Sequence, residues 1–479
     1  MYRSFLLFPV LLTTQLIYSQ RESVETLLAD TSMAHASVSV CFLDATDGRI
    51  VYQYDSEKSL IPASVLKLIT SSAALELLGP QYRFRTLLGY SGSLNRTTGK
   101  LTGDLIIKGG GDPALGSEYF SDHYSSLFKN WIVAVKDLGI KKIEGRVLVD
   151  DSRYDYQPVP PKWLWEDLGN YYGAGVYGLS VFDNTFRIHF RTLSEGTLPE
   201  IISITPASCK YELSNWLIAS GDKDNGYVFS APYGNSGWLG GSIPANREDF
   251  VLRASIPDPP LFLAKVLNNM LDSAGIKISG QPTTSRLLKM PYEKEPVLIS
   301  EVLSPPLEEI IEVLNHESMN LYAEHLLKEM GKVFKDSGST AAGLEVLNQY
   351  LNDTGIGTDG IYLTDGSGVS PLDAISSGKM AELLFHLKYN GKYFSEFYRS
   401  LPDAGKEGTL KSAFTDPVFD SKLRAKSGSM TRVRSYAGYL KAKTGRDLVF
   451  CIIINNFSGP SQAIVEGIEE ILKEAIIKN

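Results

Sequence analysis

The apolar and polar positions at the start of the chain follow the short patterns typical of β-strands. Residues 36–43 and 49–54 lie on either side of Asp47 and Gly48. An Asp-Gly pair between two strand-like runs is a strong hairpin signal, because it suits the tight turn that joins antiparallel strands. The chain is therefore expected to open with a β-hairpin.

The end of the chain predicts three more strands and a helix. Strand-like runs occupy residues 421–426, 435–441 and 448–455, and residues 462–477 have the apolar spacing of an amphipathic helix. Together with the first hairpin, these runs predict one five-stranded antiparallel sheet flanked by helices. Both ends of the chain would then share one core.

A buried helix is predicted after the hairpin. Pro62 suits the first turn of a helix, apolar residues continue to Leu78, and Gly79 with Pro80 forms a stop signal. Because this segment is apolar nearly all round, we expect the helix to be buried.

The middle of the chain follows a different pattern, in which short β-like runs are separated by glycine and aspartate turn signals. Its glycine-rich segments match neither a P-loop nor a dinucleotide-binding motif, so we interpret them as turns. A chain of 479 residues also exceeds the roughly 250–300 residues that one core supports. We predict one domain made of residues 21–84 and 290–479, interrupted at 85–289 by an insertion of two small β-rich domains.

Composition excludes several function classes. Lys plus Arg number 47 against 55 Asp plus Glu, so the formal net charge is -8, whereas binding to a phosphate backbone requires a basic surface. Nucleic acid is not an expected partner. The three cysteines form no CxxC pair and the six histidines are scattered, so neither a metal site nor a disulfide framework is expected.

Residues 1–20 have the outline of a secretory signal peptide. Arg3 precedes an apolar stretch at 5–12, and the small residue Ser19 suits a cleavage site. Pro9 and the polar residues after the stretch make it too short for a membrane anchor. We therefore expect an exported, periplasmic protein.

Ser64 and Lys67 are the first candidates for chemistry. Three residues apart at the start of a helix, their side chains lie on one face within hydrogen-bond reach. A partly desolvated, neutral lysine there accepts the proton of a serine nucleophile. The S-x-x-K spacing also occurs at Ser126/Lys129, Ser220/Lys223 and Ser376/Lys379. Ser64 differs because its helix is apolar, where an ionisable lysine is costly unless it has a function.

Ser318-Met319-Asn320 interrupts a second helical pattern, and a loop between two helices aims polar side chains into a cleft. As the alternative, Ser318 caps the helix that follows. The S-x-N spacing also occurs at Ser93/Asn95, so this motif is weak when taken alone.

Residues 426–429, Lys-Ser-Gly-Ser, end a predicted strand and offer a lysine, a hydroxyl and a close-approach glycine to the edge of a pocket. A hairpin turn is the alternative. The sequence Lys-Thr-Gly at 443–445 lies between two strand-like runs and has the composition of an exposed turn. We therefore favour 426–429 as the third motif.

In chain order, these three motifs resemble those of the penicillin-recognising serine enzymes. Further segments resemble the D-alanyl-D-alanine carboxypeptidase/endopeptidase family of the penicillin-binding protein 4 type: residues 103–105, 109–113, 171–174, 365–368 and 436–439. The resemblance covers nearly all of the mature chain. In that family a large insertion separates the first two motifs, which accounts for the distance from Lys67 to Ser318.

The resemblance implies an α+β fold, with a penicillin-binding/β-lactamase-like catalytic domain that carries a large, mainly β insertion. It implies a serine D-Ala-D-Ala carboxypeptidase and DD-endopeptidase that acts on the stem peptides of peptidoglycan, is inhibited by β-lactams and needs no cofactor. Peripheral association with the cell wall or the membrane surface, and the oligomeric state, are left open.

The resemblance also implies a role for each candidate residue. Three are expected to be catalytic: the nucleophile Ser64, the general base Lys67 and the proton relay Ser318. Five are expected to bind the substrate: Asn320, Lys426, Ser427, Gly428 and Ser429. Asn320 would hold the substrate amide and Lys426 with Ser427 the terminal carboxylate, while backbone N–H groups of Ser64 and Ser429 would stabilise the oxyanion.

Two residues depart from the family pattern. Ser427 replaces the usual threonine but keeps the hydroxyl, and Met319 stands where a polar residue is common. The loop at 365–370 is family-like and is assigned to structure. A β-lactamase-like hydrolase and a non-catalytic cell-wall binding protein remain as alternatives, whereas a Ser-His-Asp esterase would need a GxSxG motif, which the sequence lacks.

Overall fold

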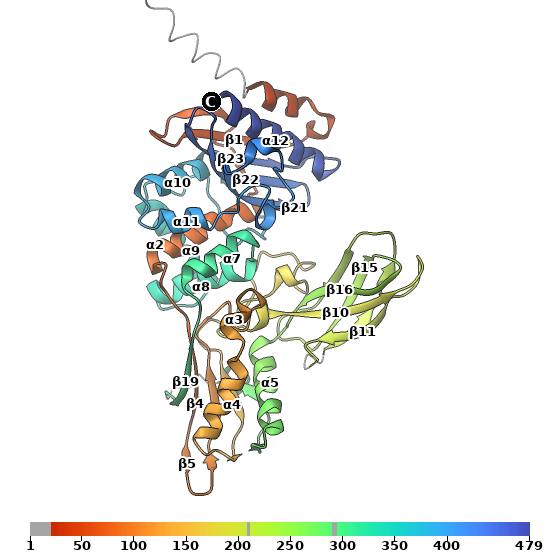
Figure 1. Ribbon diagram of the computed structural model, residues 1–479, viewed down its shortest axis with the longest axis vertical. Helices are drawn as coiled ribbons and strands as arrows, with labels where there is room; N and C mark the ends of the chain where they lie inside the picture. The colour runs from red at the N-terminus through yellow and green to blue at the C-terminus, as the bar shows by residue number, and fades with distance from the viewer. Residues whose placement is uncertain (1–20, 208–210, 290–294) are drawn as a thin grey trace, which may run out of the picture. The chain divides into compact units, whose positions relative to one another are not determined.

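The computed structural model describes residues 21–207, 211–289 and 295–479 (Figure 1). The predicted leader at 1–20 lies outside the described residues. Contacts divide the chain into two compact units, the first made of the residues up to Pro80, 311–319 and 344–479, and the second of 81–310 and 320–343. The domain boundaries expected at 84/85 and 289/290 stay a prediction.

The first unit is built on one antiparallel sheet with the strand order β2-β1-β23-β22-β21. Its strands are β1 (Ser37–Asp44), β2 (Ile50–Tyr54), β21 (Leu423–Met430), β22 (Val433–Lys441) and β23 (Asp447–Asn455). The predicted five-stranded sheet made from both ends of the chain is therefore confirmed. A short second pairing joins β3 (Ser59–Leu60) to β20 (Ile375–Ser376).

Helices cover both faces of this sheet, and in Figure 1 α12 and α10 lie beside it. The helices of this unit include α2 (Lys67–Leu78), α10 (Ser377–Asn390), α11 (Phe394–Arg399) and α12 (Ser461–Lys478), and residues 21–29 are helical as well. Side chains of β23 alternate between the faces: Phe450 and Ile452 join the core formed with α12, and α10 packs on β1 and β23. Burial from both sides explains why β23 reads as a continuous apolar run.

Two helices of the chain each contain a boundary between the two units. These are α7 (Leu307–His316) and α9 (Thr340–Asp353). Within the described residues, no helix combines the length and apolar character needed to span a bilayer.

The second unit contains four sheets in its described part. One has the order β18-β9-β7-β4-β19 and a second β17-β8-β6-β5, while β11-β10-β16 forms a third; in the fourth, β12, β13 and β14 all pair with β15. The strands are β4 (Arg85–Tyr90), β5 (Ser93–Asn95), β6 (Lys100–Thr102), β7 (Leu105–Lys108), β8 (Lys142–Ile143), β9 (Val147–Asp150), β10 (Thr185–Thr192), β11 (Glu200–Thr205), β12 (Glu212–Asn215), β13 (Ile218–Ala219), β14 (Asn225–Phe229), β15 (Ser236–Ile243), β16 (Arg247–Ser255), β17 (Lys277–Ile278), β18 (Thr283–Thr284) and β19 (Val297–Leu303). The helices are α3 (Ser121–Tyr124), α4 (Leu127–Asp137), α5 (Pro259–Ser273), α6 (Ser285–Leu288) and α8 (Asn320–Lys335).

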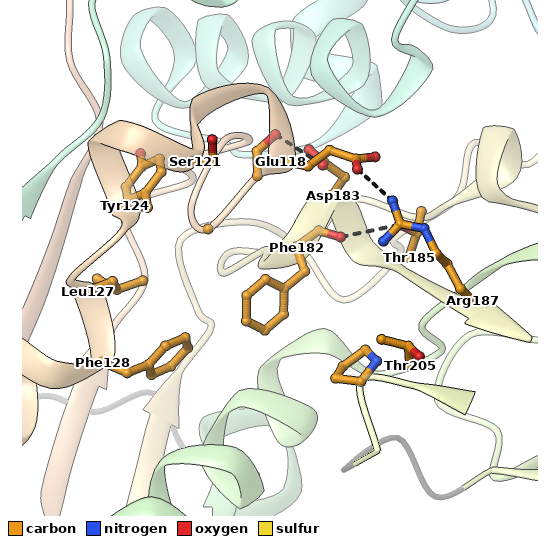
Figure 2. A pocket seen from close by; sticks show the side chains of 13 residues that line it. Glu118, Ser121, Tyr124, Leu127, Phe128, Phe182, Asp183, Thr185, Arg187 and Thr205 are labelled. Atoms are coloured by element: carbon orange, nitrogen blue, oxygen red, sulfur yellow. Dashed lines mark hydrogen bonds and ion pairs between the residues drawn. The ribbon is translucent and has the colours of Figure 1, made fainter. Parts of the chain in front are cut away.

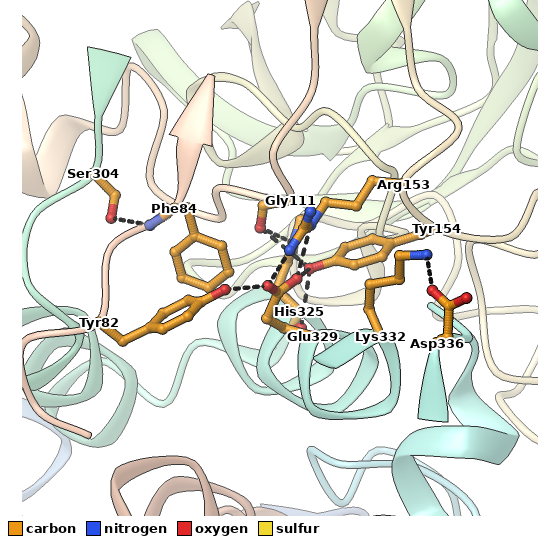
Figure 3. Close-up of polar contacts among 10 residues, drawn as sticks. All are labelled: Tyr82, Phe84, Gly111, Arg153, Tyr154, Ser304, His325, Glu329, Lys332 and Asp336. Carbon is orange, nitrogen blue, oxygen red and sulfur yellow. Dashed lines mark hydrogen bonds and ion pairs between the residues drawn. The ribbon is translucent and has the colours of Figure 1, made fainter. Parts of the chain in front are cut away.

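Helix α8 is anchored in the second unit by the buried carboxylate of Glu329 (Figure 3). Arg153 Nε donates to this carboxylate over 3.0 Å and Tyr154 Oη over 2.8 Å, and Tyr82 Oη donates to it as well. A buried charge is tolerated only when it is paired and hydrogen-bonded, so these contacts fix the position of α8 along its axis. The helix begins at Asn320, one of the candidate residues.

Candidate functional site

Ser64 lies in a tight turn immediately before a buried helix. The turn is a 3-10 helix, Ala63–Leu66, and the α-helix α2 begins only at Lys67. The sequence predicts a continuous helix through Ser64; the structure differs because Ala63 has a φ of 47°, which an α-helix does not contain. Such backbone strain at a non-glycine residue persists only where the surroundings enforce it, and it is common at functional sites.

Lys67 is fully buried, and its Nζ lies 2.9 Å from Ser64 Oγ and 2.7 Å from the carbonyl oxygen of Ser367. The other S-x-x-K pairs have ordinary surroundings. Lys129 and Lys223 are exposed, and Ser376 caps α10 by accepting the N–H of Lys379. Among the four pairs, this one joins a serine to a fully buried lysine.

The loop at 365–370 supports this pair, a role that the sequence did not indicate. The buried carboxylate of Asp365 accepts four backbone N–H groups, those of Ser367, Gly368, Val369 and Ser370. Beside it, burial and the neighbouring carboxylate of Asp365 raise the pKa of Asp373 well above its usual range. The loop is thereby held in the shape that points the Ser367 carbonyl at Lys67.

Gly368 is the point where this loop meets the turn that carries Ser64. Its φ is 78°, and a Cβ there would lie 2.0 Å from the carbonyl oxygen of Ala63. We expect Gly368→Ala to lower the rate of acylation by a penicillin about 10- to 100-fold, since displacements near 1 Å have effects of this size. Gly355→Ala is the matched control, because Gly355 has a φ of 80° with open space around it. Equal acylation rates in the two variants would show that the contact with Ala63 does not matter.

Ser318 and Lys426 meet in the same unit as Ser64. Lys426 Nζ lies 2.9 Å from Ser318 Oγ, and the lysine side chain is fully buried. Burial, and then the charge of Lys67, hold the pKa of Lys426 well below its usual range. Ser318 has a φ of 57°, whereas helix caps have extended backbones, so the alternative of an N-cap is wrong.

Residues 426–429 lie within β21, paired with residues 434–437 of β22, so the hairpin-turn alternative is wrong for this segment. A Cβ on Gly428 would lie 3.1 Å from the backbone nitrogen of Ser64 and 2.2 Å from Ser435 Oγ. The glycine therefore lets the strand edge lie against the turn that carries Ser64. By contrast, residues 443–445 lie exposed between β22 and β23, as predicted for a turn.

Two residues beside β21, Thr409 and Arg434, could not be identified as site neighbours from the sequence. Ser427 Oγ donates to Thr409 Oγ1 over 2.8 Å, and Arg434 donates to the hydroxyl of Ser429. Thr409 follows Gly408, whose φ of 47° and contact with the carbonyl of His316 allow no side chain. A glycine before a threonine is too common a pair to have pointed to this position.

Asn320 belongs to the second unit and is described there. Its Nδ2 donates to the carbonyl oxygen of Tyr172 over 2.8 Å. The other seven predicted site residues lie in the first unit. The structure brings together Ser64 with Lys67 and Ser318 with Lys426, and it places Gly428 against the Ser64 turn.

The second unit has a pocket of about 340 Å³, which none of the predicted site residues line (Figure 2). Glu118 and Arg187 form an ion pair at its side. Burial raises the pKa of Asp183 to about 6, and its carboxylate accepts the hydroxyls of Ser117 and Tyr322. The side chains of Asp183, Ser117 and Tyr322 are thus bonded to one another, as in a structural network.

Comparisons with known proteins agree with the motifs. A sequence profile described as the "D-Ala-D-Ala carboxypeptidase 3 (S13) family" matches residues 20–474. A D-alanyl-D-alanine carboxypeptidase of Actinomadura sp. (strain R39) is 27% identical over 459 residues, which cover 93% of this chain and 82% of the relative. The carboxypeptidase DacB of Haemophilus influenzae is 24% identical over 424 residues, covering 86% and 83%.

Solved structures show the same fold. The crystal structure of penicillin binding protein 4 (dacB) from Haemophilus influenzae matches with a TM-score of 0.82 at 21% identity, over 96% of this chain and 99% of that chain. A second structure of that protein, complexed with a β-lactam, matches with a TM-score of 0.76 at 20% identity over the same shares. The expected α+β fold with a sheet-rich insertion is confirmed.

Proposed function

Since this chain belongs to the D-Ala-D-Ala carboxypeptidase 3 (S13) family and is a serine-type D-Ala-D-Ala carboxypeptidase, we propose that it acts on peptidoglycan peptides through an acyl-enzyme on Ser64. The observation that carries the proposal is the buried Lys67 Nζ, 2.9 Å from Ser64 Oγ. Because Lys67 is fully buried, desolvation penalises a charged amine at this position, and the proposal has Lys67 act in its neutral form. As a neutral amine it takes the serine proton while Oγ attacks the carbonyl of the penultimate D-Ala.

Collapse of the tetrahedral intermediate requires a proton on the departing D-Ala amine. In the proposed mechanism the Ser318 hydroxyl passes this proton on, and its contact with Lys426 Nζ at 2.9 Å keeps the hydroxyl oriented. Water then attacks the ester on Ser64, which releases the shortened peptide and restores the free serine. The proposed steps use groups of the protein and one water molecule.

Substrate binding is assigned to the edge of β21. Lys426 and Ser427 bind the terminal carboxylate, and the backbone N–H groups of Ser64 and Ser429 stabilise the oxyanion. The close approach of Gly428 to the Ser64 turn supports this arrangement. Asn320 holds the substrate amide.

The same acylation extends the proposal to cross-links and to inhibitors. A D-Ala cross-link presents the same carbonyl, so we include DD-endopeptidase action. β-Lactams would acylate Ser64 and inhibit the enzyme, and the structure of the Haemophilus influenzae relative complexed with a β-lactam supports this part.

Export to the periplasm belongs to the proposal because the substrate lies outside the cytoplasm. The leader-like pattern at 1–20 supports it. N-terminal sequencing of the mature protein tests it, and an intact Met1 is the contradicting result.

Incubation with muropeptides tests the proposed carboxypeptidase and endopeptidase activities. The purified protein is incubated with uncross-linked pentapeptides and with cross-linked dimers, and the products are weighed by mass spectrometry. We expect loss of one D-Ala from the first and monomers from the second, with neither product in Ser64→Ala. D-Ala release by Ser64→Ala would rule out the proposed nucleophile.

A further inference from the structure

Aromatic side chains form a row on and beside the sheet around β15 in the second unit. Figure 1 labels this strand. Trp131 and Trp163 are buried, whereas the other three of the five tryptophans gather here. The Trp238 ring centroid lies 6.0 Å from that of Trp165 and 6.4 Å from that of Trp216. Trp165 is 49% exposed and Trp216 67% exposed, and contiguous exposed rings of this kind mark binding surfaces.

Hydrogen bonds fix the backbone segments that carry these rings. Trp238 lies on β15, between β12 and β14, and the N–H of Trp216 donates to the carbonyl of Leu239 over 3.0 Å. The turn that carries Trp165 is fixed to β14, because Asn170 Oδ1 accepts the N–H of Val228 over 3.0 Å. Rings that are fixed before binding lose little entropy when a ligand stacks on them.

The row continues toward the segment that contacts the residue proposed to hold the substrate amide. Trp238 stacks on Phe229 with centroids 5.2 Å apart, and Phe229 lies 6.2 Å from Tyr227. The N–H of Val228, the residue after Tyr227, donates to Asn170 Oδ1, so the segment that carries Tyr172 lies beside β14. The carbonyl oxygen of Tyr172 accepts Nδ2 of Asn320, so the aromatic row ends at Tyr227 close to the segment that contacts Asn320.

We propose that Trp165, Trp238 and Trp216 bind the sugar chain of peptidoglycan, a polymer of N-acetylated hexosamines. The inference rests on the proposed function, because a substrate peptide held at Asn320 carries its sugars at its far end. A pyranose ring presents flat C–H faces that stack on indole, and the ring spacings here are comparable to the width of one sugar. An anionic membrane surface fits less well, since the chain has a net charge of -8.

Binding of chitotetraose, a soluble tetramer of N-acetylglucosamine, tests the proposal by tryptophan fluorescence. We expect a saturable change whose dissociation constant rises at least about tenfold in Trp216→Ala, the loss of one good stacking contact. Tyr389→Ala is the matched control, because Tyr389 is 62% exposed on α10 in the first unit. Absence of binding, or equal binding by Trp216→Ala, would overturn the proposal, as would adsorption to phosphatidylglycerol vesicles that Trp216→Ala abolishes.

A second measurement separates this inference from the proposed function. The rates of D-Ala release are compared for one stem peptide with and without its disaccharide, and we expect Trp216→Ala to lower the ratio of kcat/KM values at least about fivefold. An unchanged ratio with active enzyme contradicts sugar binding. No D-Ala release from either substrate, with chitotetraose still bound at the row, contradicts the proposed function and leaves the sugar site supported.

Discussion

Replacing Lys67 by arginine is expected to lower the rate of Ser64 acylation by about 10²- to 10⁴-fold, the usual contribution of a general base. Arginine keeps the charge but does not release its proton at working pH. Because Lys67 is fully buried, the larger guanidinium also strains the site, so Lys67→Met serves as a second variant that removes the amine at similar length. Acylation is followed with a fluorescent penicillin, and thermal unfolding shows which variants are folded.

Lys129→Arg is the control for this series. Lys129 has the same S-x-x-K spacing to Ser126 but is exposed, and we expect its replacement to leave the acylation rate within about twofold. Near wild-type acylation by a folded Lys67→Met would remove Lys67 from the role of base.

Lys426→Ala is expected to lower kcat/KM for D-Ala release by about 30- to 1,000-fold, equivalent to about 2–4 kcal/mol of transition-state binding. The change removes the cation assigned to the substrate carboxylate and leaves Ser318 Oγ without its contact at 2.9 Å. Lys443→Ala is the matched control, since Lys443 begins the Lys-Thr-Gly turn and is exposed. We expect it to change kcat/KM by less than about threefold. A large loss of kcat/KM in Lys443→Ala with a small loss in Lys426→Ala would show that the third motif was assigned to the wrong segment.

The pH dependence adds a second readout for Lys426. Burial, the largest cause, holds its pKa well below the usual lysine value. As the pH rises through that lowered pKa the ammonium loses its proton, so kcat/KM for a carboxylate-terminated peptide falls. A peptide with a C-terminal amide has no negative charge for the Lys426 ammonium to bind. The pH profile of kcat/KM for this peptide should therefore lack the fall at high pH. Identical alkaline limbs for both peptides would contradict the assigned role.

The sheet could be predicted because its strands carry their own signals. The Asp-Gly turn and the apolar run of β23 are local patterns, and the strand-like runs at the two chain ends together supply the five strands of the sheet. Ser64 could be separated from three other S-x-x-K serines because burial of a lysine shows in the apolar residues around it.

What could not be predicted depends on contacts between distant residues. The role of the 365–370 loop rests on one backbone carbonyl, that of Ser367, which reaches Lys67 across 300 positions of the chain. Thr409 is brought to Ser427 in the same way. Helix α8 groups with residues 81–310 and bonds to them through Glu329 among other residues, and no sequence pattern pairs that carboxylate with Arg153.

The acyl-enzyme on Ser64 is tested most directly by locating the adduct that a penicillin leaves on the protein. After incubation and digestion, mass spectrometry should find the adduct on the peptide that contains Ser64, and Ser64→Ala should carry none. An adduct on Ser126, Ser220 or Ser376 would contradict the assignment of the nucleophile. Rapid hydrolysis of the penicillin without a lasting adduct would instead indicate a β-lactamase-like enzyme and contradict inhibition through a stable acyl-enzyme.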